Sequence, residues 1–411
     1  MQRIGAWGVV AMTVCAAVAG CNAVGSAPSG AAELNTERAA SAAVGRPRAD
    51  HEDEPNDDFD TARPLTVPAG GAAHAAGQLF WSEDVDVYDL GPATAGWRWQ
   101  AELTAEADAV PGAALFDASG ALLARAMPDR EAGNTWRIDV VTPYDSDAWL
   151  LAIAGRPDTE SSGDYQLHVF GEDTGSIPQA RPQTVLLNFS GTDSLALCGQ
   201  TPDIPPFRAE SIDPALAGET DRMIEVITEA VRADFAAFEV RIVTSRDELP
   251  PETPFTTIHF GAYDPDLLGL AEQVDARNQD QGDVAVVFVD SFTAFLELEP
   301  GPDELAQALA NIASHEIGHL LGLVHTTGDH DQMDVTATCS EVLEDRWFTR
   351  SPLDPRVFPI GEQDAPAQLA RTVGLRAQPE GITDPPLRTI DPQGRNRPIS
   401  TAGVEPTAGA F

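Results

Sequence analysis

Hydrophobic and polar residues alternate over short stretches in the first half of the chain. Residues 85–90 read VDVYDL and residues 165–169 read YQLHV, whereas residues 149–153 form a continuous apolar run. Alternation with a period of two is typical of half-buried strands, and a short apolar run between turn residues is typical of a fully buried one. These patterns predict an all-β sandwich over residues 51–172.

A different periodicity follows an expected linker at residues 173–183. Residues 220–238 and 303–323 place apolar side chains at helical spacing. Apolar runs at 185–189, 240–243, 257–260 and 284–289 predict strands between and before these helices. This mixture of helices and strands predicts an α/β or α+β domain over residues 184–375, so the chain is expected to be multidomain.

The amino terminus has the layout of a targeting signal. A single early charge, Arg3, precedes an apolar run at 4–19 that is too short for a comfortable membrane span, which predicts a signal peptide over residues 1–20. The run ends in VAGC, which resembles a bacterial lipobox and implies acylation of Cys21 and a lipid anchor to the membrane. Asn22 after it implies the outer membrane or cell surface of the bacterial envelope. An ordinary secretory signal is the alternative.

Composition narrows the classes of partner. The 411 residues include 65 acidic and 25 basic side chains, all of the latter Arg, for a net charge of −40. Phosphate backbones would repel such a chain, so no nucleic-acid partner is expected. With 43% apolar residues the chain can form cores. Small residues at 21–50 and the Pro- and Gly-rich stretch 376–411 predict a flexible tether and a disordered tail.

Three segments of the β-rich part resemble bacterial pre-peptidase C-terminal domains: EPNDDF at 54–59, DVDVY at 84–88 and GDYQL at 163–167. The resemblance implies a non-catalytic companion of a secreted peptidase, here placed before the second domain. Substrate binding, spacing and assistance in folding all stay open as its role. Asp84 and Asp86 could bind calcium, although a solvated strand edge is the favoured interpretation.

The strongest pattern lies at the end of the helix predicted over 303–323. His315 and His319 are four residues apart and therefore share one helix face, and Gly322 can adopt the positive φ that ends the helix and returns His325. Three neutral imidazoles leave a fourth tetrahedral position open, which is typical of a catalytic zinc site. Glu316 borders the same position and is the candidate general base.

The spacing HExxHxxGxxH resembles that of the metzincin metallopeptidases. The resemblance implies a zinc-dependent endopeptidase that acts on a protein or peptide substrate, with Met333 in a tight turn beneath the metal at a matrixin-like distance. It also implies that strand 284–289 forms the upper edge of the cleft, and residues 361–375 resemble the last helix of such domains. No Tyr stands two positions after Met333, so the additional ligand of astacins and serralysins is missing. Asp329 and His330 are interpreted as loop residues.

Other polar groups leave alternatives open. In an oxidising compartment Cys198 and Cys339 are expected to form a disulfide, and the alternative is a latent state in which the Cys198 thiolate occupies the zinc's open position. An oxygen-rich stretch could hold a structural calcium, although solvated loops are favoured; it comprises Asp264, Asp266, Asp275, Asn278, Asp280 and Asp283.

Two other functions also fit the sequence. One is a lipid-anchored envelope binding protein whose zinc domain is not catalytic. The other is a zinc amidase that acts on cell-wall peptides. The intact Glu316 favours an enzyme, because a structural zinc site needs no base.

Overall fold

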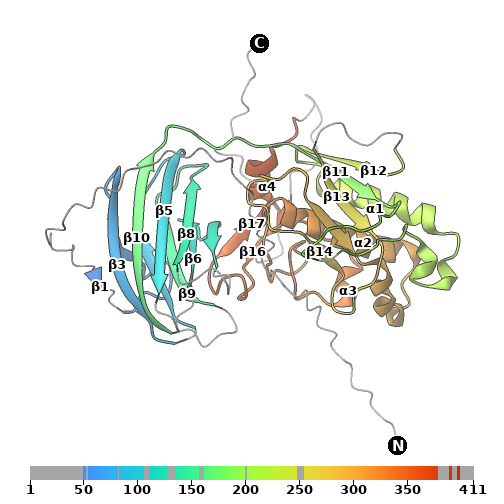
Figure 1. Cartoon of the computed structure of the whole chain (residues 1–411), viewed down its shortest axis with the longest axis horizontal. Coiled ribbons are helices and arrows are strands. Elements are labelled where there is room, and N and C mark those ends of the chain that lie inside the picture. Colours follow the sequence, from blue (N-terminus) through green and yellow to red (C-terminus); the bar gives the residue numbers. More distant parts are fainter. Residues whose placement is uncertain are drawn as a thin grey trace, which may run out of the picture.

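The computed structural model describes residues 50–51, 54–81, 83–105, 111–127, 135–156, 162–199, 201–247, 254–377, 388–390 and 396–398. It consists mostly of β-sheet with fewer helices, arranged as a β-sandwich beside a unit of mixed sheet and helices (Figure 1). None of the helices in this part of the chain has both the length and the apolar character that crossing a membrane requires.

The sandwich is built from two sheets, each with five strands among the described residues. Alternate side chains of both sheets meet in one core that includes Trp99, Trp149 and Tyr165. Across it, the hydroxyls of Tyr88 and Tyr165 lie 2.7 Å apart. The first sheet has the order β1 (Asp50–His51), β3 (Gly71–Leu79), β10 (Gly163–Asp173), β5 (Trp97–Ala105), β8 (Thr135–Val141). The second has the order β2 (Arg63–Pro64), β4 (Val85–Asp89), β9 (Trp149–Gly155), β6 (Pro111–Asp117), β7 (Leu122–Ala126).

The second unit contains a mixed sheet whose last strand runs antiparallel to the others. Its order is β12 (Val240–Thr244), β11 (Gln183–Asn188), β13 (Thr256–Phe260), β15 (Val284–Val287), β14 (Gly269–Ala271). Two long helices, α1 (Thr220–Asp234) and α2 (Pro302–Leu320), share one apolar core with this sheet. Shorter elements complete the unit: η1 (Ala209–Ser211), η2 (Pro214–Leu216), η3 (Val289–Leu298), α3 (Cys339–Val342), β16 (Arg350–Pro352), β17 (Glu362–Asp364) and α4 (Ala365–Val373).

The edge strand differs from the one that the resemblance implied. β15 lies between β13 and β14, so the prediction that residues 284–289 form the upper edge of a cleft was wrong. The described sheet ends instead at β14, where Gly269 pairs with Val287 and Ala271 pairs with Ala285. A strand of three residues is too short to show a period of two, which explains why the sequence pattern did not reveal it.

The sandwich and the second unit share an apolar interface. Phe116 of β6 packs against Phe358, with ring centroids 5.7 Å apart, and Val324 belongs to the same cluster. At the rim, Arg350 of β16 donates to the carbonyl oxygen of Ser119 at 2.6 Å. Because apolar side chains from both units are buried together, packing fixes the position of the sandwich relative to the second unit. The two units lie side by side in Figure 1.

Both ends of the chain extend past the described residues. Residues 1–49 lie outside the described part of the chain. They include Cys21, the predicted signal peptide and nearly all of the predicted tether. Of the predicted tail, the structure describes residues 376–377 and a short antiparallel pair, β18 (Arg388–Ile390) and β19 (Asn396–Pro398).

Candidate metal centre

The helix that carries the histidine motif is defined at both ends by local chemistry. Pro302 occupies the first turn of α2, where its missing N–H costs nothing, and the Glu304 carboxylate accepts from the backbone N–H of Gly301 at 2.7 Å. After Leu320 the chain turns at Gly322, whose φ is +93°. A Cβ atom there would lie 3.0 Å from the carbonyl oxygen of Asp275, so both conformation and space require glycine.

Three imidazoles converge beyond this turn. The Nε2 atom of His319 lies 3.1 Å from Nε2 of His315 and 3.0 Å from Nε2 of His325. A tetrahedral zinc ion bound at 2.0–2.1 Å holds its nitrogen ligands roughly 3.3 Å apart, close to these separations. The triad is one of two groups of His, Cys, Asp or Glu in the described part of the chain that could hold a metal.

The outer nitrogens of two rings fix which nitrogen faces inward. His315 Nδ1 lies 2.8 Å from the carbonyl oxygen of Gln332, and His319 Nδ1 lies 2.9 Å from that of Leu323. A carbonyl oxygen only accepts, so each Nδ1 carries the proton and each Nε2 turns a lone pair toward the centre. Lone pairs this close repel one another, and a cation between them removes that repulsion.

Burial keeps the triad in its ligating, neutral form. It lowers the pKa of His315 to about 4 and that of His319 to about 3, and it lowers the pKa of His325 well below its ordinary value. All three side chains are buried. The site therefore offers three neutral nitrogen donors at neutral pH, which is the donor set that zinc prefers.

The segment that returns His325 is held by a side chain from β17. The Gln363 amide donates to the carbonyl oxygen of Val324 at 2.9 Å and accepts from its N–H at 2.7 Å, as a neighbouring strand would. Asp354 adds a backbone bond from its N–H to the carbonyl oxygen of His325 at 3.1 Å. The sequence analysis missed Gln363, because no motif connects it to a ligand so far away along the chain.

Met333 lies directly beneath the helix. It is completely buried, and a Cβ atom on Gly318 would lie 2.6 Å from its sulfur atom. The turn is anchored by the N–H of Thr326, which donates to the carbonyl oxygen of Met333 at 3.0 Å. Met333 therefore packs against Gly318, between the two histidines of the helix.

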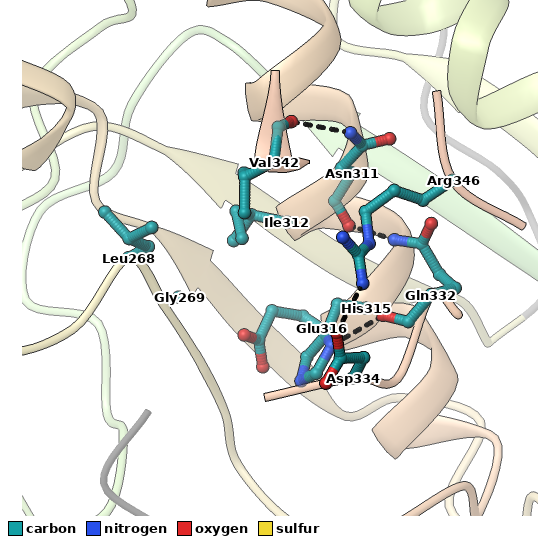
Figure 2. A pocket seen from close by; sticks show the side chains of 10 residues that line it. All are labelled: Leu268, Gly269, Asn311, Ile312, His315, Glu316, Gln332, Asp334, Val342 and Arg346. Carbon is teal, nitrogen blue, oxygen red and sulfur yellow. Dashed lines mark hydrogen bonds and ion pairs between the residues drawn. The ribbon is translucent and has the colours of Figure 1, made fainter. Parts of the chain in front are cut away.

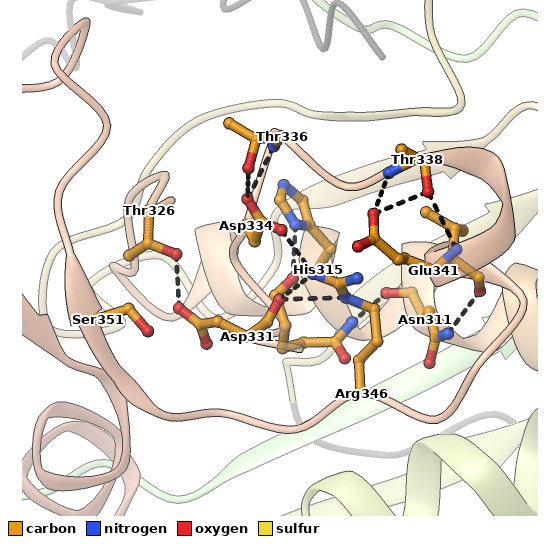
Figure 3. A network of polar contacts seen from close by, with 12 residues as sticks. Asn311, His315, Thr326, Asp331, Asp334, Thr336, Thr338, Glu341, Arg346 and Ser351 are labelled. Atoms are coloured by element: carbon orange, nitrogen blue, oxygen red, sulfur yellow. Dashed lines mark hydrogen bonds and ion pairs between the residues drawn. The ribbon is translucent and has the colours of Figure 1, made fainter. Parts of the chain in front are cut away.

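A network of polar contacts lies next to His315 (Figure 3). Arg346 donates to the carbonyl oxygen of Asp331 at 2.7 Å and forms a buried ion pair with Asp334 at 2.9 Å. The Asp331 carboxylate accepts from the Thr326 hydroxyl at 2.5 Å. Gln332, next in the chain, holds His315 through its carbonyl oxygen. The network therefore positions a ligand, although its members gave no signal in the sequence.

Glu316 lies in a narrow cavity between α2 and β14 (Figure 2). Its carboxylate approaches Gly269 so closely that a Cβ atom there would clash with it. Burial raises the pKa of Glu316 to about 8, and a hydrogen bond from the backbone of Ala271 opposes that rise. The cavity has a volume of about 20 Å³, and His315 and Arg346 also line it. A carboxylate beside the triad in a confined space is suited to proton transfer.

The predicted disulfide is wrong. Cys198 and Cys339 are not joined by a disulfide in the described structure. Cys198 lies near the carbonyl oxygen of Glu272 and packs in a small cluster beside β14, whereas Cys339 begins α3 and packs on the main core of the unit. They therefore pack against different apolar clusters. Neither joins the triad in the described structure, so the latent-state alternative gains no support.

The aspartates that were interpreted as solvated are largely buried. Asp84 and Asp86 are 1% and 0% exposed, which corrects the interpretation as a solvated strand edge. Together with Glu54 they place three ligand oxygens within 4.8 Å of one another.

The oxygen-rich stretch in the second unit is also partly buried. Asp275, Asn278 and Asp283 are inside, so the interpretation as solvated loops is wrong for them. The Asp275 carboxylate accepts from the N–H of Asp280 in the same loop at 2.7 Å, and the Asn278 amide ties the loop to β11 by donating to Gln183 at 3.1 Å. As interpreted from the sequence, Asp329 and His330 are exposed loop residues, and the His330 ring stacks on Trp347.

No family model and no curated protein matches the chain. Among solved structures, it is similar to the pre-peptidase C-terminal domain of a collagenase from Bacillus anthracis, at 16% identity and a TM-score of 0.22, over 29% of this chain and 99% of the other. It is also similar to archaemetzincin from Methanopyrus kandleri, at 20% identity and a TM-score of 0.24, over 41% and 89% of the chains.

A zinc-dependent peptidase from Methanocorpusculum labreanum shows a similar level of likeness, at 16% identity and a TM-score of 0.23, over 40% of this chain and 95% of the other. At TM-scores below 0.5, none of these likenesses carries an argument about the chemistry of the chain. The case for that chemistry rests on the geometry of the site.

Proposed function

We propose that the chain is a zinc-dependent endopeptidase of the metzincin type. The observation that carries the proposal is the convergence of His315, His319 and His325 on one point, with Glu316 beside it in a confined cleft. Three neutral nitrogen donors, a neighbouring carboxylate and Met333 beneath the site are together suited to hydrolysis. A metal site that only stabilises the fold needs no such carboxylate.

Different residues of the chain have different roles in the proposed hydrolysis. The triad would hold the zinc, which when bound polarises a carbonyl and lowers the pKa of water. Glu316 takes the proton of the attacking water and passes it to the leaving amine. Its carboxylate lies beside the triad in the narrow cavity, which places it next to a water molecule that a bound zinc would hold. β14 lines the cleft with backbone groups to which an extended peptide can add as a further strand.

The cavity beside Glu316 indicates a preference for a small side chain. It is walled by Asp334, Val342 and Arg346, all of which follow Met333, and its volume of about 20 Å³ is close to the space for a single water molecule. We infer that this cavity receives the residue after the scissile bond. Glycine or alanine would fit there best.

The proposal is tested by loading and removing zinc. We expect one zinc per chain, cleavage of casein by the loaded protein, loss of cleavage with a chelator, and recovery with added zinc. Profiling of the new peptide amino termini would then report the cleaved sites. Casein left intact by fully loaded protein would contradict the proposal. Cleavage of purified cell wall in place of casein would favour the amidase, and no cleavage of either would favour a binding protein.

We further propose that the protein is a lipoprotein of the bacterial envelope, acylated at Cys21. The support is the VAGC sequence at residues 18–21 after a short apolar run. We expect a radiolabelled fatty acid to be incorporated into the wild type and not into Cys21→Ser, and the variant to leave the membrane fraction. Equal labelling of both proteins would contradict the anchor.

We also propose that the sandwich binds calcium at Glu54, Asp84 and Asp86. Three carboxylates so close together repel one another when ionised, and a divalent cation removes that repulsion. The neighbouring Asn56 is completely buried, and its side-chain amide has no hydrogen-bond partner among the described residues. An amide oxygen is a further ligand of the kind that calcium takes.

Calcium should therefore stabilise the protein. At about 100 times its Kd, calcium should raise the free energy of unfolding by about 2.7 kcal/mol. Urea unfolding with calcium and with a calcium chelator measures this difference. Asp84→Asn should reduce the gain, whereas the exposed neighbour Glu83→Gln should retain it. If the urea unfolding curve of the wild type were the same with calcium and with the chelator, the site would be ruled out.

A further inference from the structure

The two faces of β6 pack against different parts of the molecule. Ala113 and Leu115 point into the core of the sandwich, whereas Ala114 and Phe116 pack against residues of the second unit, among them Val324. Successive side chains of a strand point to opposite faces, so this division follows from the alternation itself. The outer face of the second sheet is therefore turned toward the segment that leads to the third histidine.

Arg125 of β7 belongs to this outer face. It is paired with Ala114 in the antiparallel register of β6 and β7, and residues directly paired in this way share a face. Its neighbours Ala124 and Ala126 pack with the sandwich core on the other face, as the alternation requires. The partly buried side chain of Arg125 is thus directed toward the second unit, on the face where Ala114 belongs to one cluster with Val324, the residue before His325.

A second arginine near the same segment already has an anionic partner. Arg356 forms an ion pair with Asp354 at 2.7 Å, and the N–H of Asp354 donates to the carbonyl oxygen of His325 at 3.1 Å. The charge of Arg356 is therefore balanced by a carboxylate next to the third histidine.

The positive charge of Arg125, by contrast, is not balanced by an anionic group within the described structure. No hydrogen bond or ion pair there engages its guanidinium, although the chain contains 65 acidic residues. A guanidinium remains charged in proteins and offers five N–H donors, and leaving it partly buried without an anion is costly. A partly buried arginine without an anion, close to a candidate catalytic centre, is suited to bind an anion that arrives with the substrate.

The geometry points to Arg125 as a specificity-determining residue that the β-sandwich contributes to the cleft, where it binds a carboxylate side chain of the peptide substrate near the scissile bond. The inference rests on the proposed peptidase function and names its substrate class: peptides with Asp or Glu near the cleaved bond, at a position other than the one that enters the small cavity beside Glu316. Arginine pairs with a carboxylate through two parallel hydrogen bonds, which adds orientation to affinity. This role of Arg125 would also make the sandwich part of the substrate-binding site.

Matched peptides test this role. Pairs that differ only by Glu or Gln at one position flanking the cleaved bond should differ in kcat/KM by roughly 10- to 100-fold for the wild type, in favour of Glu, at one position at least. Arg125→Met should remove the difference by weakening cleavage of the Glu peptide alone. Arg125→Lys should retain part of it. Arg137→Met, which changes an exposed arginine of the same sandwich, should preserve it in full.

Binding gives a second measurement that does not depend on turnover. In the Glu316→Gln background, fluorescence titration should show the Glu peptide binding more tightly than the Gln peptide, and Arg125→Met should abolish that preference. Equal affinities in the background protein, or an equal loss for both peptides in the variant, would overturn the inference. Zinc-loaded wild type that cleaves no peptide would overturn the proposed function, and this titration would still decide whether Arg125 selects carboxylates.

Discussion

Replacing Glu316 by Gln should reduce peptide hydrolysis by about 10²- to 10⁴-fold while the protein continues to bind one zinc. The amide has nearly the same shape as the carboxylate but cannot accept the proton of the attacking water. The triad is held in place without Glu316, because His315 and His319 form their hydrogen bonds with the backbone carbonyl oxygens of Gln332 and Leu323. We therefore expect the loss in kcat, measured on a casein-derived peptide, with little change in zinc stoichiometry or thermal unfolding.

Two controls sharpen this test. Glu344→Gln removes an equal charge from an exposed position after α3 and should leave kcat unchanged. Glu316→Asp retains a base but withdraws it from the site by one methylene, so its activity should lie between those of the wild type and the amide variant. Activity of Glu316→Gln within a factor of three of the wild type would assign the proton transfer to another group.

The elements that sequence patterns predicted are those with strong periodicity or a motif. The run at 149–153 became β9, the alternation at 165–169 became part of β10, and the amphipathic stretch at 303–323 contains most of α2. His315, His319 and His325 could be singled out because their spacing alone brings them together, through one helical turn and one glycine bend. Local rules suffice for such features.

What the sequence did not reveal depends on contacts between distant segments. β14 has three residues, so its place at the edge of the sheet is set by pairing with β15 and not by its own pattern. Gln363 and Arg346 act on the ligand segment from other elements, and each resembles an ordinary polar residue in the sequence. The burial of Asp84 and Asp86 similarly depends on the packing of the sandwich. Tertiary contacts override the preference of acidic residues for the surface.

Replacing Arg346 by Met should destabilise the metal-free protein by about 3–5 kcal/mol. Arg346 is 3% exposed, and its removal leaves the buried Asp334 carboxylate without its cation and the carbonyl oxygen of Asp331 without a charged donor. Breaking one side of a buried ion pair costs more than the pair contributes as a whole, because the remaining charge stays desolvated. Urea unfolding of the metal-free protein measures the loss.

The matched variants separate this cause from the loss of one arginine in general. Arg222→Met breaks an exposed ion pair with Asp303 and should cost no more than about 1 kcal/mol. Arg346→Met combined with Asp334→Leu removes both charges and should recover much of the stability. Gln332 lies in the chain between Asp331 and Asp334, the two residues that Arg346 binds, and its carbonyl oxygen holds His315. Zinc affinity should therefore also fall by about 10- to 100-fold in the single variant. A single variant as stable as Arg222→Met would show that the network does not support the histidine site.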